Sequence, residues 1–455
     1  MNQLPFSTLA LPDRINSLLD ASSEPGADFS GHNEILAVRG TLNGLPAWIA
    51  TQNSKVAGGT LGAVQTQALL DLCAIVMEEK PTALVLMLES GGVRLHEGNR
   101  GMAGLAKVMQ QVLAIRRAGI VTVAVIGGRF GCWGGATLIS GVCDTTLMVD
   151  ASRYGLSGPK VLQEMAEASG RVIANKEEIA PLLTAAHRAT TGEIQESVED
   201  DVATVRSAVE RAIASGGTDP ILRAQDALLQ SQARMRGATI QTQRISDALP
   251  GVKLSMPTEN LWHDVFDTCQ VNVEIPGVVC GAGNLDEREI PFLGCTSDAA
   301  MGPVQGLELL RCALQASRAR PSCILLLADA VQAFDLDNER YGYGQMLSAL
   351  AQVLGHTAAT VCPVIGWLRC AGSGASMVAL SMCGVSLYAH RDAQIHPLPP
   401  NVVAGFVANQ VRADIDANSS PKNFQRLGMV KEVWGDEYIT RLRAVLRDPG
   451  VASSG

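Results

Sequence analysis

Short apolar runs recur along the chain, separated by longer stretches in which the apolar residues follow a helical period. The runs 83–88, 121–126 and 323–327 have the length of a buried strand and are too short to cross a bilayer. Strands that alternate with helices in this way pair in parallel through right-handed crossovers. The pattern therefore predicts an α/β fold with buried parallel strands and no membrane span.

The same order of elements occurs twice. Each half begins with a pair of strands, followed by a helix that opens at a glycine, a buried strand, a long helix, a second buried strand and a glycine-rich helix. A sustained order of this kind predicts an internal duplication. The predicted strand pairs are 34–42 with 45–52 and 268–275 with 278–285. Landmarks about 240 residues apart are Gly62 and Gly302, 83–92 and 323–332, Gly127 and Gly366, and Gly158-Pro159 and Leu398-Pro399.

The length of 455 residues allows two or three domains. A Gly-Gly break and a proline follow the first half, at 216–220, and they favour a boundary there. We predict an N-terminal domain over 1–215, a helical and polar linker over 216–255, and a C-terminal domain over 256–455.

Composition narrows the function classes. Hydrophobic residues make up 47% of the chain and charged ones 18%, which suits buried α/β layers. The net charge of −9 and the lack of a dense basic run argue against nucleic acid as a partner. The first twenty residues lack a positive segment followed by an apolar core, so we expect a cytoplasmic protein. The eleven cysteines include no C-x-x-C pair, so we expect neither a disulfide framework nor a metal site.

Glycine-rich turns follow the buried strands in both halves. One strand ends at 89–94 (ESGGVR) and the next at Gly127-Gly128, and the counterparts are 328–332 and Gly366. A small-residue helix follows each time. The first N–H groups of a helix have no internal acceptor, glycine lets a ligand oxygen approach them, and the helix dipole adds positive charge. Two converging turns thus predict an oxyanion hole made of main chain, although the same glycines could serve only tight helix packing.

These residues resemble a known family. The stretches 89–99 (ESGGVRLHEGN), 131–135 (GCWGG), 155–161 (GLSGPKV) and 189–193 (ATTGE) resemble the β subunit of biotin-independent malonate decarboxylase. The second half resembles the γ subunit through Asp329, Gln332, 339–342 (ERYG), 372–374 (GSG) and 423–428 (NFQRLG).

The resemblance implies two tandem crotonase-like domains of the ClpP/crotonase, carboxyltransferase type, each a β-β-α superhelix, with the β and γ chains fused. It implies decarboxylation of a malonyl thioester on an acyl-carrier protein, through an enolate held by two backbone oxyanion holes, with the thioester between the domains. The catalytic residues it implies are Gly91, Gly92, Gly134, Gly135, Val331, Gln332, Gly372, Ser373 and Gly374. The substrate-binding residues it implies are Arg94, His96, Gly131, Cys132, Gly158 and Pro159.

No cofactor bound by this chain is implied. The thioester would be of the phosphopantetheine type, on a carrier protein or on coenzyme A, and the partners would be an acyl-carrier protein and an acyl-carrier transferase subunit. Crotonase-like cores pack face to face, either within the fused chain or in a homodimer. Two alternatives stay open: a carboxyltransferase that moves the carboxyl group to or from biotin, and a non-catalytic scaffold.

The second half departs from the γ pattern D-T-x-G-Q. An ungapped alignment places Ala328 at the acid and Val331 at the glycine, while the family's S-G-G falls on either 372–374 or 373–375. The second oxyanion hole is therefore the weakest part of the comparison.

Several single residues have two interpretations. His96 and Glu97 could protonate the enolate or form a surface pair, and Arg94 could hold a carboxylate or a structural ion pair. We favour a core role for Cys132 and a structural role at a strand end for Asp329. Lys55 and Lys160 are candidate phosphopantetheine contacts, with solvated surface as the favoured alternative.

Overall fold

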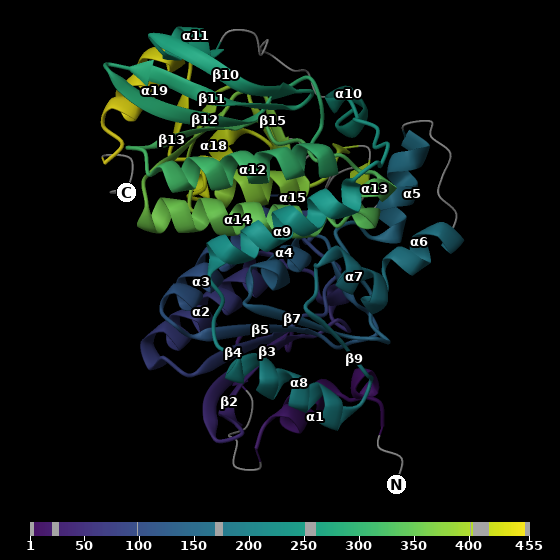
Figure 1. Ribbon diagram of the computed structural model, residues 1–455. Coiled ribbons are helices and arrows are strands. Elements are labelled where there is room, and N and C mark those ends of the chain that lie inside the picture. The colour runs from purple at the N-terminus through teal and green to yellow at the C-terminus, as the bar shows by residue number, and fades with distance from the viewer. Residues whose placement is uncertain are drawn as a thin grey trace. The chain divides into compact units, whose positions relative to one another are not determined.

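The computed structural model describes residues 4–20, 27–97, 99–168, 176–250, 261–400, 402–403 and 418–450. The chain, drawn in Figure 1, divides into two compact units. The first unit comprises Met1–Arg94, Lys107–Lys160 and Ala174–Asp219. The second comprises Leu95–Ala106, Val161–Ile173 and Pro220–Gly455. The helical part of the predicted linker that follows Asp219 thus belongs to the second unit, and residues 251–255 of that linker lie outside the described residues.

The first half of the chain contains one seven-stranded sheet. Its elements are η1 (Phe6–Thr8), α1 (Leu11–Leu18), β1 (Ala27–Asp28), β2 (Ile35–Leu42), β3 (Leu45–Gln52), η2 (Ala57–Gly59), α2 (Ala63–Glu79), β4 (Ala83–Met87), η3 (Leu95–Glu97), α3 (Arg100–Arg117), β5 (Val121–Ile126), β6 (Cys132–Trp133), α4 (Gly135–Val142), β7 (Thr145–Val149), β8 (Tyr154–Gly155), α5 (Pro159–Ala168), α6 (Lys176–Leu182), α7 (Ala185–Thr191), β9 (Glu196–Val198) and α8 (Val202–Ala214).

The second half repeats this plan. Its elements are α9 (Pro220–Met235), α10 (Ile245–Ala248), α11 (Leu261–Val265), β10 (Thr268–Ile275), β11 (Val278–Leu285), β12 (Arg288–Cys295), α12 (Pro303–Ala319), β13 (Ile324–Ala328), α13 (Leu336–Arg340), α14 (Tyr343–Thr360), β14 (Val364–Leu368), β15 (Ala371–Ser373), α15 (Gly374–Met377), the π-helix η4 (Val378–Met382), β16 (Ser386–His390), β17 (Gln394–His396), α18 (Pro421–Arg426), β18 (Glu432–Trp434) and α19 (Tyr438–Arg447).

The two main sheets have the same topology. Their strand orders are β1-β2-β3-β4-β5-β7-β9 and β10-β11-β12-β13-β14-β16-β18. In each, the first three strands are antiparallel and the following ones are parallel. The short strands β6 and β8, and β15 and β17, form a separate two-stranded ribbon in each half. Each strand of the first main sheet therefore has a counterpart at the same position of the second, as the predicted duplication requires.

One correction concerns the early strands of the second half. The predicted pair 268–275 and 278–285 exists, but a third long strand, β12, follows and is the one that pairs with the buried strand β13. The counterparts of β2 and β3 are thus β11 and β12. Charged residues at 286–289 and Pro291 interrupt the apolar pattern of this strand, which explains why the sequence did not indicate it.

The helix that opens at a glycine begins in the same way in both halves. The Gly62 N–H donates to Oε1 of Gln65 at 2.9 Å, and the Gly302 N–H donates to Oε1 of Gln305 at 3.1 Å. In each case a side chain from the first turn reaches back to the residue before the helix, as in the second half of a capping box. This repeated bond fixes the start of α2 and α12 relative to the turns discussed below.

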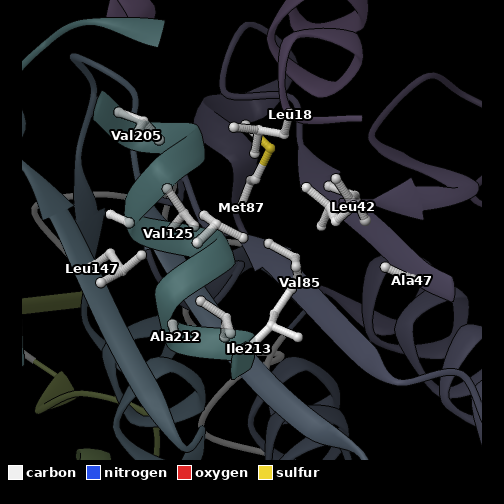
Figure 2. Close-up of a cluster of buried hydrophobic side chains, with 14 of the residues drawn as sticks. Leu18, Leu42, Ala47, Val85, Met87, Val125, Leu147, Val205, Ala212 and Ile213 are labelled. Atoms are coloured by element: carbon white, nitrogen blue, oxygen red, sulfur yellow. The ribbon is translucent and has the colours of Figure 1, made fainter. Parts of the chain in front are cut away.

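Each sheet has one face covered by helices from the two ends of its half. In the first unit, α1 and α8 pack on the strands, and Figure 2 shows side chains of α8 such as Val205 and Ile213 directed at Val85 and Val125. In the second unit, α11 and α19 take this position over an aromatic core that includes Trp367. Burial of these apolar side chains provides the main stabilisation of each unit. In the described part of the chain, no helix combines the length and the apolar character that crossing a membrane requires.

Asp20 ties three segments of the first unit together, and this gives a testable pH dependence. Its carboxylate accepts hydrogen bonds from the Gly44 N–H at 2.9 Å and the Thr41 hydroxyl at 2.7 Å, and it pairs with Arg206 of α8. The Gly44 N–H first, and then the Thr41 and Arg206 bonds, lower the pKa of Asp20 from 3.8 to about 2.

We predict that Asp20→Asn lowers the free energy of unfolding at pH 7. Because the folded-state pKa lies below the ordinary value, the ionised carboxylate stabilises the fold above pH 4, and this contribution disappears as the pH falls towards 2. We expect a deficit of about 1 kcal/mol or less, since the pair is partly solvated. Urea unfolding at pH 7 and pH 2.5 measures it. An equal deficit at both pH values contradicts the assignment.

Candidate functional site

A buried carboxylate anchors the turn that follows β4. Glu89 is 6% exposed, and its carboxylate accepts a hydrogen bond from Nη1 of Arg14 at 2.9 Å and one from the Phe130 N–H at 3.1 Å. Gly128 lies directly against it, because a Cβ on this residue would come within 2.0 Å of the Glu89 carboxyl carbon. The ends of β4 and β5 are thereby held together through one side chain.

Most N–H groups of this turn donate within the chain. The Gly91 N–H donates to the Gly58 carbonyl at 2.8 Å, and the Gly92 N–H donates to Oγ of Ser90 at 3.1 Å. The Gly134 N–H donates to the Gly155 carbonyl at 3.1 Å. Gly91 and Gly92 belong to the turn after β4 and Gly134 to the turn after β5, and the N–H groups of all three already have acceptors within the chain.

Two other N–H groups have no acceptor among the described residues, those of Val93 and Gly135. Val93 forms an isolated parallel bridge with Leu61, and the bonds of that bridge run through the Gly92 carbonyl and the Arg94 N–H. The N–H of Val93 itself therefore points to the opposite side. We call Val93 and Gly135 the first donor pair.

The two members of this pair are brought close by their glycine neighbours. A Cβ on Gly92 would lie 3.6 Å from the Gly134 Cα and 3.2 Å from the Trp133 carbonyl, so the two turns are in van der Waals contact. Gly134 has a φ of +59°, which an L-residue with a side chain seldom adopts, and this turn starts α4 at Gly135. The two N–H groups therefore lie on neighbouring turns, and the positive end of the α4 dipole lies at Gly135.

The second unit has an equivalent anchor. The carboxylate of Asp329 accepts hydrogen bonds from the Arg369 N–H at 2.9 Å and the Cys370 N–H at 2.8 Å, and it pairs with the Arg369 guanidinium at 2.8 Å. Asp329, which the internal alignment of 83–92 with 323–332 sets opposite Glu89, thus occupies the place that Glu89 has in the first unit. The structural role predicted for Asp329 agrees with these contacts.

The corresponding donors are Gln332 and Ala375. Gln332 forms the same isolated parallel bridge, here with Met301, and Gly374 has a φ of +63° before α15, as Gly134 has before α4. This equivalence selects 373–375 over 372–374 as the counterpart of the first unit's glycine turn. We call Gln332 and Ala375 the second donor pair. The turn after Asp329 is one residue shorter than the turn after Glu89.

Both N–H groups of the second donor pair are engaged. The Gln332 N–H donates to Oγ of Ser373 at 3.2 Å, and the Ala375 N–H donates to Oε1 of Gln332 at 2.7 Å. Of the other residues predicted here, Val331 is fully buried, and Gly372 packs so closely that a Cβ would lie 2.3 Å from Sδ of Met377.

The predicted side chains of the first half have different surroundings. Arg94 pairs with Glu34 at 2.6 Å, which matches the structural interpretation. Cys132 is fully buried, and burial together with the charge of Glu89 raises the pKa of its thiol, so it is unsuited to act as a nucleophile. Gly131 has a φ of +86° and its Cα packs on the Arg153 carbonyl.

The remaining candidates lie near the surface of the chain. His96 is exposed in η3 and Glu97 beside it is half-buried, while Gly158 is half-buried before α5. Exposed residues are Lys55, Pro159 and Lys160. Val93 and Ala375 were not predicted as donors from the sequence. The position after Gly92 was the available signal, but the direction of the Val93 N–H depends on the bridge to Leu61.

Comparison with known proteins shows a likeness to carboxyl transferase domains, mainly in the first half of the chain. Residues 20–226 match the family model of the carboxyl transferase domain. This match and the repeated sheet topology confirm the predicted carboxyltransferase-type, crotonase-like α/β fold.

Among curated proteins, the chain is similar to the malonyl-S-ACP:biotin-protein carboxyltransferase MADC of Malonomonas rubra, with 32% identity over 144 residues, covering 29% of this chain and 45% of that protein. It is also similar to the acetyl-coenzyme A carboxylase carboxyl transferase subunits beta/alpha of Saccharopolyspora erythraea, with 31% identity over 184 residues, covering 34% of this chain and 32% of that protein. The matches thus span less than half of these relatives.

Among solved structures, the chain is similar to the Pseudomonas malonate decarboxylase MdcD-MdcE hetero-dimer. The identity is 31% and the TM-score 0.44, and the match covers 50% of this chain and 96% of that one.

The role of the Asp329–Arg369 ion pair as the anchor of the second site can be tested by measuring the free energy of unfolding. We predict that Arg369→Met lowers the free energy of unfolding by about 3–5 kcal/mol, because it leaves the Asp329 carboxylate buried without its cation. The control is Arg391→Met, since Arg391 pairs with Asp436 at the surface and should lose less than 1 kcal/mol. Urea unfolding compares the two, and similar losses would show that Asp329 does not depend on Arg369.

Proposed function

We propose that this chain acts on the carboxyl group of an acyl thioester, and specifically that it decarboxylates a malonyl thioester carried by an acyl-carrier protein. The observation that carries the proposal is the first donor pair, two backbone N–H groups for which the described residues offer no acceptor, one of them at the start of α4, in the part of the chain that matches the carboxyl transferase domain. The similarity to proteins whose names include malonyl carboxyltransferase and malonate decarboxylase supports the choice of a malonyl group.

In the proposed reaction, the C–C bond to the carboxylate breaks and CO₂ leaves. The electron pair of that bond moves into the thioester as an enolate, whose negative charge lies mainly on the thioester oxygen. The enolate carbon then takes up one proton, which gives the acetyl thioester. His96 and Glu97, which follow Val93 closely in the chain, are our candidates for delivering this proton.

The first donor pair suits this step because it addresses the atom where charge develops. N–H groups held by a folded backbone need no rearrangement during the reaction, and removing one such donor typically lowers turnover about 10²–10³-fold. No side-chain nucleophile is required, in keeping with the buried thiol of Cys132.

A second candidate is transfer of the carboxyl group to biotin. The relative from Malonomonas rubra is named as a malonyl-S-ACP:biotin-protein carboxyltransferase, and its reaction needs the same enolate. In that case the carboxyl group forms a new bond to a biotin nitrogen instead of leaving as CO₂, and the proton lost from that nitrogen replaces it on the enolate carbon. Both proposals share a phosphopantetheine-type thioester as substrate, on a carrier protein or on coenzyme A. The partners we propose are an acyl-carrier protein and an acyl-carrier transferase subunit.

Carboxyl-labelled malonyl-carrier protein distinguishes these candidates when it is incubated with the full chain. Release of labelled CO₂ together with acetyl-carrier protein, in the absence of biotin, supports decarboxylation. Strict dependence on biotin with label on biotin supports the transferase. Absence of both products, also with malonyl-coenzyme A, overturns the proposal and favours the scaffold.

The donor assignment can be tested with Gly135→Pro. Proline removes the N–H and fits the first position of a helix, and Gly135 is not among the glycines with positive φ. We expect kcat to fall about 10²–10³-fold with little change in Tm. The matched variant is Gly135→Ala, which keeps the N–H and introduces the residue that the second unit has at Ala375. If Pro and Ala reduce turnover equally, Gly135 does not act through its N–H.

A further inference from the structure

Both N–H groups of the second donor pair already donate hydrogen bonds to side chains of this chain. The carboxamide oxygen of Gln332 accepts the Ala375 N–H at 2.7 Å, and the Ser373 hydroxyl accepts the Gln332 N–H at 3.2 Å. Gln332 is 2% exposed and Ser373 is fully buried. While these bonds exist, no ligand oxygen can use the second donor pair as the first pair would be used.

The bond to Ala375 also orients the Gln332 amide. A carboxamide nitrogen cannot accept an N–H, so the oxygen must face Ala375 and Nε2 must lie at the other end of the group. No acceptor for this Nε2 is found among the described residues. Nε2 is not among the fully buried side-chain nitrogen and oxygen atoms that lack a partner, so this end of the amide is open to an acceptor from outside the fold.

We propose that Gln332 is a substitute donor, whose Nε2 binds a carboxyl oxygen of the substrate in place of the backbone N–H that its own Oε1 covers. Accepting a hydrogen bond at Oε1 polarises the amide and makes Nε2 a stronger donor. The hydrogen bond to Ala375 stands independently, whereas the identity of the ligand rests on the proposed function.

The first unit differs at the equivalent position. Val93 has an apolar side chain that can neither cover the Gly135 N–H nor donate. The two sites therefore offer different groups: a pair of backbone N–H groups at Val93 and Gly135, and a side-chain amide at Gln332. We assign a carboxyl oxygen of the substrate to the amide at Gln332.

Two substitutions distinguish the role of the Gln332 Oε1 from that of its Nε2. Gln332→Glu keeps an oxygen for the Ala375 N–H but replaces the donor by a carboxylate oxygen. Gln332→Ala removes both ends and uncovers the Ala375 N–H. The control is Gln425→Glu, the same change at an exposed position of α18 in the same unit. Hydrogen exchange at the Ala375 amide should stay slow in Gln332→Glu and become faster in Gln332→Ala.

The second measurement is the turnover of malonyl-carrier protein by the full chain. At each pH, the turnover of each variant is divided by that of the native protein. At pH 8 we expect Gln332→Glu to be reduced about 10²-fold, with a raised KM, because one donor is lost and like charges face each other. The deficit should shrink at low pH, where a protonated Glu can donate again. Gln332→Ala should lose less, and Gln425→Glu should match the native protein.

The outcomes are distinguishable. Native-like turnover of Gln332→Glu at every pH, or turnover of Gln332→Ala above that of the native protein, would show that Gln332 merely plugs the site and overturns the inference while the proposed function stands. If the native chain neither releases nor transfers the carboxyl group, the proposed function fails, and with it the ligand assigned to Gln332. Unchanged exchange at Ala375 in Gln332→Ala overturns the hydrogen bond itself.

Discussion

The geometry of both sites depends on a carboxylate buried at the end of a strand. Glu89 and Asp329 each accept a backbone N–H from the turn after the next strand, and each is neutralised by one arginine. Such a group is costly to bury unless its charge and its lone pairs are satisfied. Because the carboxylate follows one strand and its N–H partner follows the neighbouring strand, the hydrogen bond fixes the distance between the two turns. The donor pairs are a consequence of that distance.

Duplication explains why the two halves differ so little in architecture and so much in their sites. Sheet order, the helix start at Gly62 and Gly302, and the positive φ of Gly134 and Gly374 are the same in both. At the sites, the differences are the side chains that follow the anchors and the turn after Asp329, which is one residue shorter. A backbone that is already specified by packing leaves those positions free to diverge.

Much of the fold could be predicted from the sequence, because buried parallel strands leave short apolar runs and the repeat keeps its register. β12 could not, since its charges and Pro291 break that pattern while pairing on both sides compensates in the folded chain. The glycines indicated the turns correctly. Which N–H groups lack acceptors depends on contacts between residues distant in sequence, such as Leu61 with Val93 and Gln332 with Ala375, and no local pattern contains them.

The turn after Asp329 is one residue shorter than the turn after Glu89, while the strands on either side keep their pairing. A gene can gain or lose a single codon in one event. Here such an event would shift the residue that follows the turn without disturbing the hydrophobic layers beneath it. After a duplication, the two copies can thereby acquire different chemistry at matching places while the ancestral scaffold is retained.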